Sequence, residues 1–142
     1  METPAVQPPY EEEEGDNDDH ESVDLQHLRH QGFHQALLSL QPSNKTIDLS
    51  GKYITDEWFI IEFLPVFEIL TESTQLFLSN NCLQDKALVG LARVLALNKH
   101  RKLVLLYLDS NEFTDEGLSS LLKAIPSSIS IPAVIAYRIV PW

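Results

Sequence analysis

The sequence is short of cysteine and of long apolar runs, and each shortage excludes a class of protein. The single cysteine, Cys82, cannot form a disulfide within the chain, which favours a reducing compartment. The apolar run over 58–70 is too short and too charged to cross a bilayer. The first residues are acidic, whereas a secretory signal begins with basic residues and an apolar stretch. We therefore expect a cytoplasmic or nuclear protein with no membrane partner.

The motifs of common enzyme and cofactor sites are also missing. The sequence contains no glycine-rich phosphate loop, no G-x-S-x-G nucleophile motif, no HExxH zinc motif and no paired cysteines. It has no basic stripe of the kind that binds nucleic acid. We therefore expect a protein that is not an enzyme, takes no cofactor and has no nucleic-acid partner.

Basic residues are absent from the start of the chain, where acidic residues gather instead. Residues 1–24 carry ten carboxylates and no lysine or arginine, which leaves eleven acids and ten bases for residues 25–142. A segment of like charge cannot bury enough apolar surface to offset its conformational entropy. The sequence therefore predicts a disordered, acidic, solubilising tail over residues 1–22, with a docking arm for a basic partner as the alternative.

A repeat governs the rest of the chain. Segments 47–56, 76–85 and 106–115 align without gaps, and their starts lie 29 and 30 residues apart. Each reads apolar-x-apolar and ends in aspartate, and the second and third have asparagine five residues after their start. An apolar stripe at helical spacing follows two of them: Leu88, Leu91, Ala92 and Leu95, then Leu118, Leu121, Leu122 and Ile125. The repeat therefore predicts strand–turn–helix units, which must stack to bury their apolar faces.

Three sets of residues have expected roles in each unit. The alternating apolar pairs point inward from short strands. Asn81 and Asn111 follow the strands, where an amide can satisfy backbone groups that the bend leaves unpaired. Asp56, Asp85 and Asp115 precede the apolar stripes, and we expect them to cap the N-termini of the helices.

These motifs resemble leucine-rich repeats of the ribonuclease-inhibitor-like class, over residues 44–126. The resemblance is carried by Leu76, Leu78, Asn81, Leu106, Leu108 and Asn111, with the first unit in register. It implies an α/β fold: a short leucine-rich-repeat solenoid with parallel strands on the concave side and helices on the convex side. Residues 23–43 are expected to form an N-terminal cap helix. Residues 127–142 are expected to form an irregular C-terminal tail or a degenerate cap.

The expected cap helix has two contrasting faces. Its apolar face, predicted to lie against the first repeat, consists of Leu25, Leu28, Phe33, Ala36, Leu37 and Leu40. The histidines His27, His30 and His34 fall on the opposite face, which we expect to be solvated. Imidazoles at helical spacing can bind zinc. A metal-responsive module is thus a further alternative, although we expect no metal site.

The resemblance also implies a function, since proteins of this family mostly bind other proteins. Side chains beside the inward leucines point out of the concave face, and the candidate partner-binding residues are Asp48, Gln75, Phe77, Ser79, Leu105, Tyr107 and Asp109. Adjacent aromatic rings at Phe77 and Tyr107 favour an interface with another protein. Two other interpretations remain: a structural pair that the C-terminal tail covers, and a regulator of a small GTPase, because GTPase-activating proteins occur in this family.

Overall fold

The computed structural model describes residues 24–125, so the predicted acidic tail over 1–22 and the predicted C-terminal segment over 127–142 lie outside the described residues. A helix covers residues 24–38, within the range 23–43 where the sequence predicts one. The elements that follow are β1 (Thr46–Asp48), α2 (Asp56–Trp58), η2 (Phe59–Phe63), α3 (Leu64–Phe67), β2 (Gln75–Phe77), α4 (Asp85–Ala96), β3 (Leu105–Tyr107) and α5 (Asp115–Ala124).

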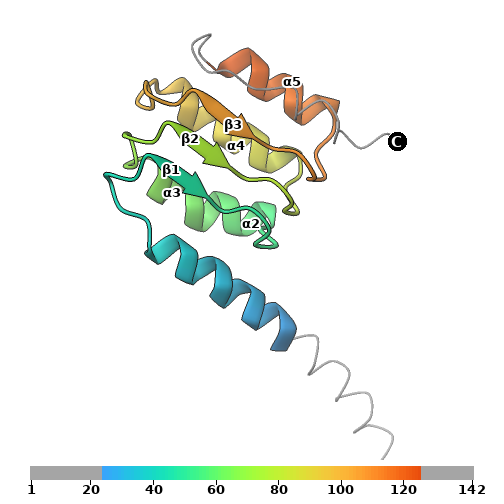
Figure 1. Ribbon diagram of the computed structural model, residues 1–142. Coiled ribbons are helices and arrows are strands. Elements are labelled where there is room, and N and C mark those ends of the chain that lie inside the picture. The colour runs from blue at the N-terminus through green and yellow to red at the C-terminus, as the bar shows by residue number, and fades with distance from the viewer. Residues whose placement is uncertain (1–23, 126–142) are drawn as a thin grey trace, which may run out of the picture.

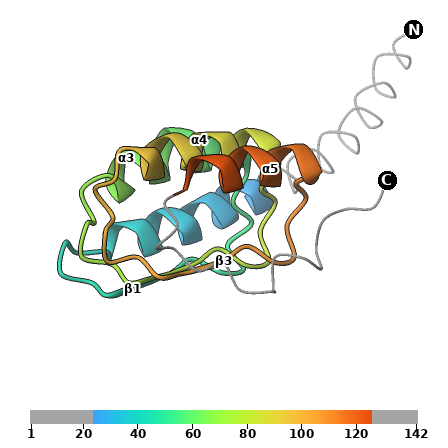
Figure 2. The same cartoon turned by 90° about the horizontal axis from the view of Figure 1, so that it is seen from above.

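The three strands form a parallel sheet in the order β1-β2-β3. Ile47 pairs with Leu76 and Leu76 with Leu106, so the strand register is the one that the sequence alignment predicts. The helices lie on one side of the sheet, and the helix over 24–38 lies beyond the β1 edge, next to the first unit (Figure 1). Figure 2 shows the same two layers from above, with α3, α4 and α5 side by side. The predicted α/β class is therefore confirmed for the described residues.

A continuous apolar core fills the space between the strands and the helices. The inward leucines of the strands, together with Leu88, Leu91, Ala92 and Leu95 of α4, belong to one buried cluster. In the first unit the aromatic rings of Phe59, Phe63 and Phe67 are stacked at centroid distances of 5.0 and 5.3 Å. All three rings are fully buried. All three units contribute to this one cluster, so each buries apolar side chains against its neighbours.

The helical segment of the first unit is irregular. It begins after Thr55, whose hydroxyl accepts a hydrogen bond from the Trp58 amide, and passes through the π-helical turn η2 before α3. Pro65 lies in the first turn of α3. A proline has no amide hydrogen, and its ring crowds the carbonyl one turn earlier, so a regular helix cannot pass through it. The wider turn before Pro65 lets the chain remain helical.

The three repeated aspartates do not cap their helices, and that prediction is wrong. The N-cap residues are Thr55, Gln84 and Thr114, all in extended conformation, and each aspartate is the first residue of its helix. Asp56 Oδ1 instead accepts a hydrogen bond of 2.6 Å from the Gln84 amide. Asp85 likewise accepts hydrogen bonds from the Thr114 amide at 2.7 Å and from its hydroxyl at 2.6 Å. The carboxylates of Asp56 and Asp85 therefore join consecutive units.

The helix over 24–38 presents a different face from the one predicted. Phe33 and Leu37 are buried and Ala36 and Leu40 pack against the core, as predicted, but the side chains of Leu25 and Leu28 are 47% and 61% exposed. His30, predicted to be solvated, instead faces the first unit. Its Nε2 lies 2.6 Å from Glu62 Oε2, and its ring lies 4.8 Å from the Trp58 ring.

The reason is the stacking of Phe33 on Trp58, with ring centroids 5.7 Å apart and planes 10° apart. This contact turns the helix so that His30, one turn before Phe33, also points inward. The apolar face predicted from the sequence is therefore correct for the C-terminal half of this helix and wrong for its N-terminal half.

Candidate functional site

The outward side of the strands brings the predicted partner-binding residues together. Gln75 pairs with Leu105, Asp48 with Phe77, and Phe77 with Tyr107, so the residues form two rows across the sheet. The Phe77 and Tyr107 ring centroids are 4.6 Å apart, with the planes tilted by 59°. In-register pairing of parallel strands puts equivalent side chains beside each other. We call the surface formed by Asp48, Gln75, Phe77, Ser79, Leu105, Tyr107 and Asp109 the strand face.

The polar residues at the end of the strand face are held in place by hydrogen bonds. The Ser79 hydroxyl donates to Asp109 Oδ1 at 2.5 Å, which links the second unit to the third. Asp48 Oδ1 accepts from the Ser50 amide at 3.0 Å. Asp48 is exposed, while the other six residues of the strand face are half-buried. The strand face therefore has an aromatic centre and carboxylates at both of its lateral edges.

The asparagines after the strands hold the turns. The Asn81 amide nitrogen donates to the carbonyls of Leu49, Leu78 and Ser79, and its oxygen accepts from the amides of Lys52 and Ile54. Asn111 donates to the carbonyls of Leu78, Leu108 and Asp109 and accepts from the Leu83 amide. Both side chains are buried, and each joins its own unit to the preceding one. As predicted, these asparagine side chains satisfy backbone groups at the turns that follow the strands.

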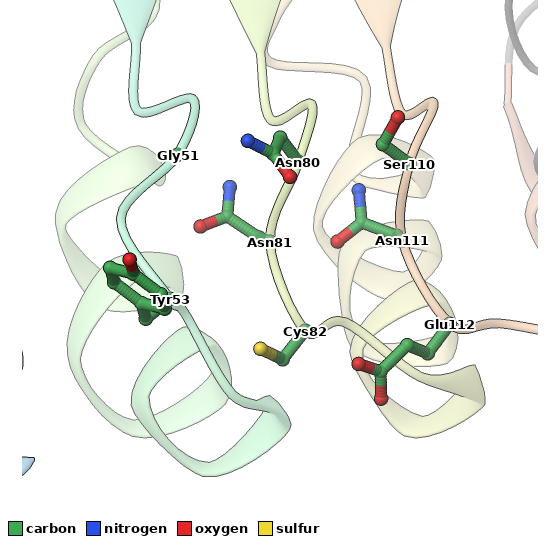
Figure 3. A pocket seen from close by; sticks show the side chains of 8 residues that line it. All are labelled: Gly51, Tyr53, Asn80, Asn81, Cys82, Ser110, Asn111 and Glu112. Atoms are coloured by element: carbon green, nitrogen blue, oxygen red, sulfur yellow. The ribbon is translucent and has the colours of Figure 1, made fainter.

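A pocket of about 500 Å³ opens next to the strand face, at the turns that follow the strands (Figure 3). It is lined by Gly51, Tyr53, Asn80, Asn81, Cys82, Ser110, Asn111 and Glu112. We call it the turn pocket. Gly51, Asn80 and Ser110 occupy equivalent positions and share a left-handed backbone, with φ of 66°, 59° and 60°. This repeated turn directs the chain away from the sheet, and the pocket lies along the turns of all three units.

Sequence analysis missed the turn pocket, although a signal for it was present. Tyr53, Cys82 and Glu112 stand in the same column of the repeat alignment, 29 and 30 residues apart. The residue type varies in that column, so the repeat pattern alone does not single it out. Parallel stacking nevertheless brings its members side by side, and variable positions that line one surface can serve recognition.

Burial and two nearby charges, Glu112 and Arg29, act on the Cys82 thiol in the turn pocket. The pKa of the Cys82 thiol is raised, first by burial and then by the negative charge of Glu112, with a smaller opposing effect of Arg29. The guanidinium of Arg29 lies 4.0 Å from the centroid of the Tyr53 ring. A thiol of raised pKa is a poor nucleophile at neutral pH, which argues against a catalytic role for Cys82.

Of the three histidines on the predicted helix face, His30 and His34 lie next to the same carboxylate, that of Glu62. Glu62 lies between His30 and His34, with Oε1 3.7 Å from His34 Nδ1. His27 lines a shallow hollow beside His30 and Glu62. Within residues 24–125, no three histidine, cysteine, aspartate or glutamate side chains are grouped so that they could hold a metal ion. No helix in the same range is long and apolar enough to cross a membrane.

Comparisons with protein-family models, curated proteins and solved structures give no match to this chain.

Proposed function

We propose that this chain is a short stack of leucine-rich-repeat type, without enzymatic activity, that binds another protein through its strand face. The observation that carries the proposal is the Phe77–Tyr107 pair, two aromatic rings in contact on the outer side of the sheet. Within residues 24–125, neither ring belongs to the buried core or to the side chains packed against it. Large apolar side chains that stabilise no core are typical anchors of protein interfaces.

The assignment to leucine-rich repeats rests on the agreement between the repeat and the hydrogen bonds of the turns. Asn81 and Asn111 occupy the asparagine position of the motif, and each bonds backbone groups of two units. Strands pair in the order of the chain with helices on one side, which is the arrangement that such repeats form. The strand side of such a stack is left open for a partner.

The chemistry of the strand face indicates the kind of partner segment that fits it. Two contacting rings offer a large, rigid apolar surface, and their burial on binding contributes more than that of smaller side chains. The carboxylates of the strand face are Asp48 and Asp109, and none of its seven residues is a lysine or an arginine. We therefore expect a segment with an apolar centre and positive charge at its periphery.

The test is a pull-down with the double variant Phe77→Ala/Tyr107→Ala, checked by its melting temperature. Loss of an interface anchor weakens binding by about 2 kcal/mol or more, roughly thirtyfold, so the double variant should lose its partner. Its melting temperature should change little, because the rings lie outside the core. The matched control is Ile61→Ser/Ile69→Ser, which removes two side chains that are each 64% exposed on the helical side.

The control variant should bind like the wild type. A double variant at Phe77 and Tyr107 that binds normally and melts at a lower temperature would contradict the proposal, since the rings would then be structural and the interface elsewhere.

A further inference from the structure

The turn pocket carries an inference that goes beyond protein binding at the strand face. Its residues follow the strand face directly, since Asn80 comes after Ser79 and Ser110 after Asp109. Figure 3 shows Tyr53 and Glu112 on opposite sides of Cys82, with the glutamate carboxylate turned into the pocket. An aromatic side chain and a carboxylate thus lie at opposite sides of the pocket.

Tyr53 already binds one guanidinium. Arg29 lies 4.0 Å from the centroid of its ring, and the ring is part of a half-exposed side chain. Arg29 lines the neighbouring pocket, together with Gln26, Thr55 and Trp58, and does not line the turn pocket. Tyr53 lines both. Tyr53 therefore borders two pockets, one lined by Arg29 and the other lined by Glu112.

Glu112 is available to a ligand. Among the described residues, its side chain accepts one hydrogen bond, a long one of 3.3 Å from Gln84 Nε2, and the residue is exposed. Of the residues in 24–125 that line the turn pocket, none is a lysine or an arginine. The amides of Asn81 and Asn111 are engaged with the backbone, whereas the Asn80 side chain is exposed at the pocket wall. The pocket is therefore negative and polar, with one aromatic side.

We propose that the turn pocket binds an arginine side chain, with its guanidinium stacked on Tyr53 and paired with the carboxylate of Glu112. A guanidinium is flat, keeps its charge, stacks on aromatic rings and donates two parallel hydrogen bonds to a carboxylate. A lysine ammonium lacks the flat face and the paired donors. The arginine belongs to the partner segment that lies on the strand face, and that part of the inference rests on the proposed function.

The experiment is an NMR titration of the whole ¹⁵N-labelled chain with N-acetyl-arginine amide as the probe. We expect shifts of the amide signals of Tyr53, Cys82 and Glu112, with a dissociation constant of about a millimolar for so small a ligand. N-acetyl-citrulline amide has the same shape without the charge and should bind at least tenfold more weakly. Free arginine should bind no better than the capped probe, and clearly stronger binding of free arginine would contradict an arginine within a peptide.

Variants connect these shifts to the pocket. Glu112→Gln and Tyr53→Leu should each weaken binding at least tenfold, while Glu116→Gln removes an exposed carboxylate outside the pocket and should have no effect. The amide spectrum of each variant shows whether it is folded. The inference is overturned if the probe binds Glu112→Gln as well as wild type, or if citrulline binds equally well. Phe77→Ala/Tyr107→Ala should still bind the probe, so this site and the strand face can fail independently.

Discussion

At the scale of single residues, Asp85 shows how two units of the stack are joined. Its carboxylate accepts hydrogen bonds from the amide and the hydroxyl of Thr114, the residue that caps α5. Gly117 makes this approach possible, because a Cβ at that position would lie 2.4 Å from Asp85 Oδ1 and 3.0 Å from the backbone of Asp85. The small residue after the repeated aspartate therefore leaves room for the preceding unit.

Replacing Asp85 by alanine should lower the free energy of unfolding by about 1–2 kcal/mol, because the amide and hydroxyl of Thr114 lose a charged acceptor. Asp115→Ala is the matched control. Asp115 also begins its helix, so both variants lose the same favourable interaction with the helix dipole. Among residues 24–125, however, it accepts no hydrogen bond from another unit. Urea denaturation measures both variants, and equal losses would contradict the joining role of Asp85.

His100 couples the stability of the fold to pH. The residue is buried, its Nε2 donates to the Phe67 carbonyl at 2.7 Å, and its ring is stacked on Phe67 at 4.0 Å. Burial is the main reason why its pKa is lowered from the usual 6.5, with Lys99 adding to the effect and the Phe67 carbonyl and Glu68 opposing it. Protonation would place an N–H at Nδ1, which is buried and has no hydrogen-bond partner among the described residues.

Because the folded pKa lies below the unfolded one, His100 is neutral in both states well above pH 6.5. Below that pH the unfolded chain takes up a proton that the folded chain resists, so stability is lost as the pH falls through 6.5 towards the lowered pKa. His100→Phe keeps a ring on Phe67 and should lose less stability than wild type between pH 7.5 and 5.5. The four other histidines are unchanged in the comparison. Parallel losses in both proteins would assign the pH dependence to those histidines.

At the scale of elements, the regular repeat units could be predicted from the sequence, but the irregular packing of the first unit could not. The strand register and the buried face of α4 follow from alternation and helical spacing alone. The first unit has Trp58 at the position of Ala87 and Gly117, and Glu62 at the position of Leu91 and Leu121. Its neighbour on that side is the helix over 24–38, where the Phe33 ring stacks on Trp58 and His30 Nε2 lies 2.6 Å from the Glu62 carboxylate. Both pairs join residues that lie far apart in the sequence, and the pattern within one segment cannot predict such contacts.

The orientation of this helix gives a direct test. Phe33→Ala should cost about 3–5 kcal/mol of unfolding free energy, because the ring is fully buried against Trp58 and the core. Leu28→Ala, on the same helix with a side chain 61% exposed, should stay within about 0.5 kcal/mol. Thermal or urea denaturation of the two variants distinguishes the observed face from the one predicted. Phe33 belongs to both faces, so Leu28 decides between them: a loss of stability for Leu28→Ala as large as that for Phe33→Ala would restore the predicted face.

At the scale of the whole molecule, the second unit lies between two described neighbours and the third has one. Leu88, Leu91, Ala92 and Leu95 of the second unit are all buried. Of the equivalent residues in the third unit, Leu121 is buried, Leu118 and Ile125 are half-buried and Leu122 is 50% exposed. The stability of a stack is the sum of what each unit contributes and what each interface adds. The third unit has one described interface fewer than the second. The cooperativity of unfolding therefore depends on how strongly the third unit is coupled to the second.

Leu108→Ala in the third unit tests that coupling, since Leu108 is fully buried beside the second unit and its loss should cost about 2–5 kcal/mol. In a Trp142→Phe background, the remaining tryptophan is Trp58, which lies in the first unit against Phe33. The Asn111 and Asp85 hydrogen bonds tie the third unit to the second, and the Asn81 and Asp56 bonds tie the second to the first. The substitution should therefore shift the urea midpoint of Trp58 fluorescence and that of far-UV circular dichroism equally, as two-state unfolding requires. A Trp58 midpoint that stays at its wild-type value while the circular dichroism shifts would mean that the third unit unfolds alone.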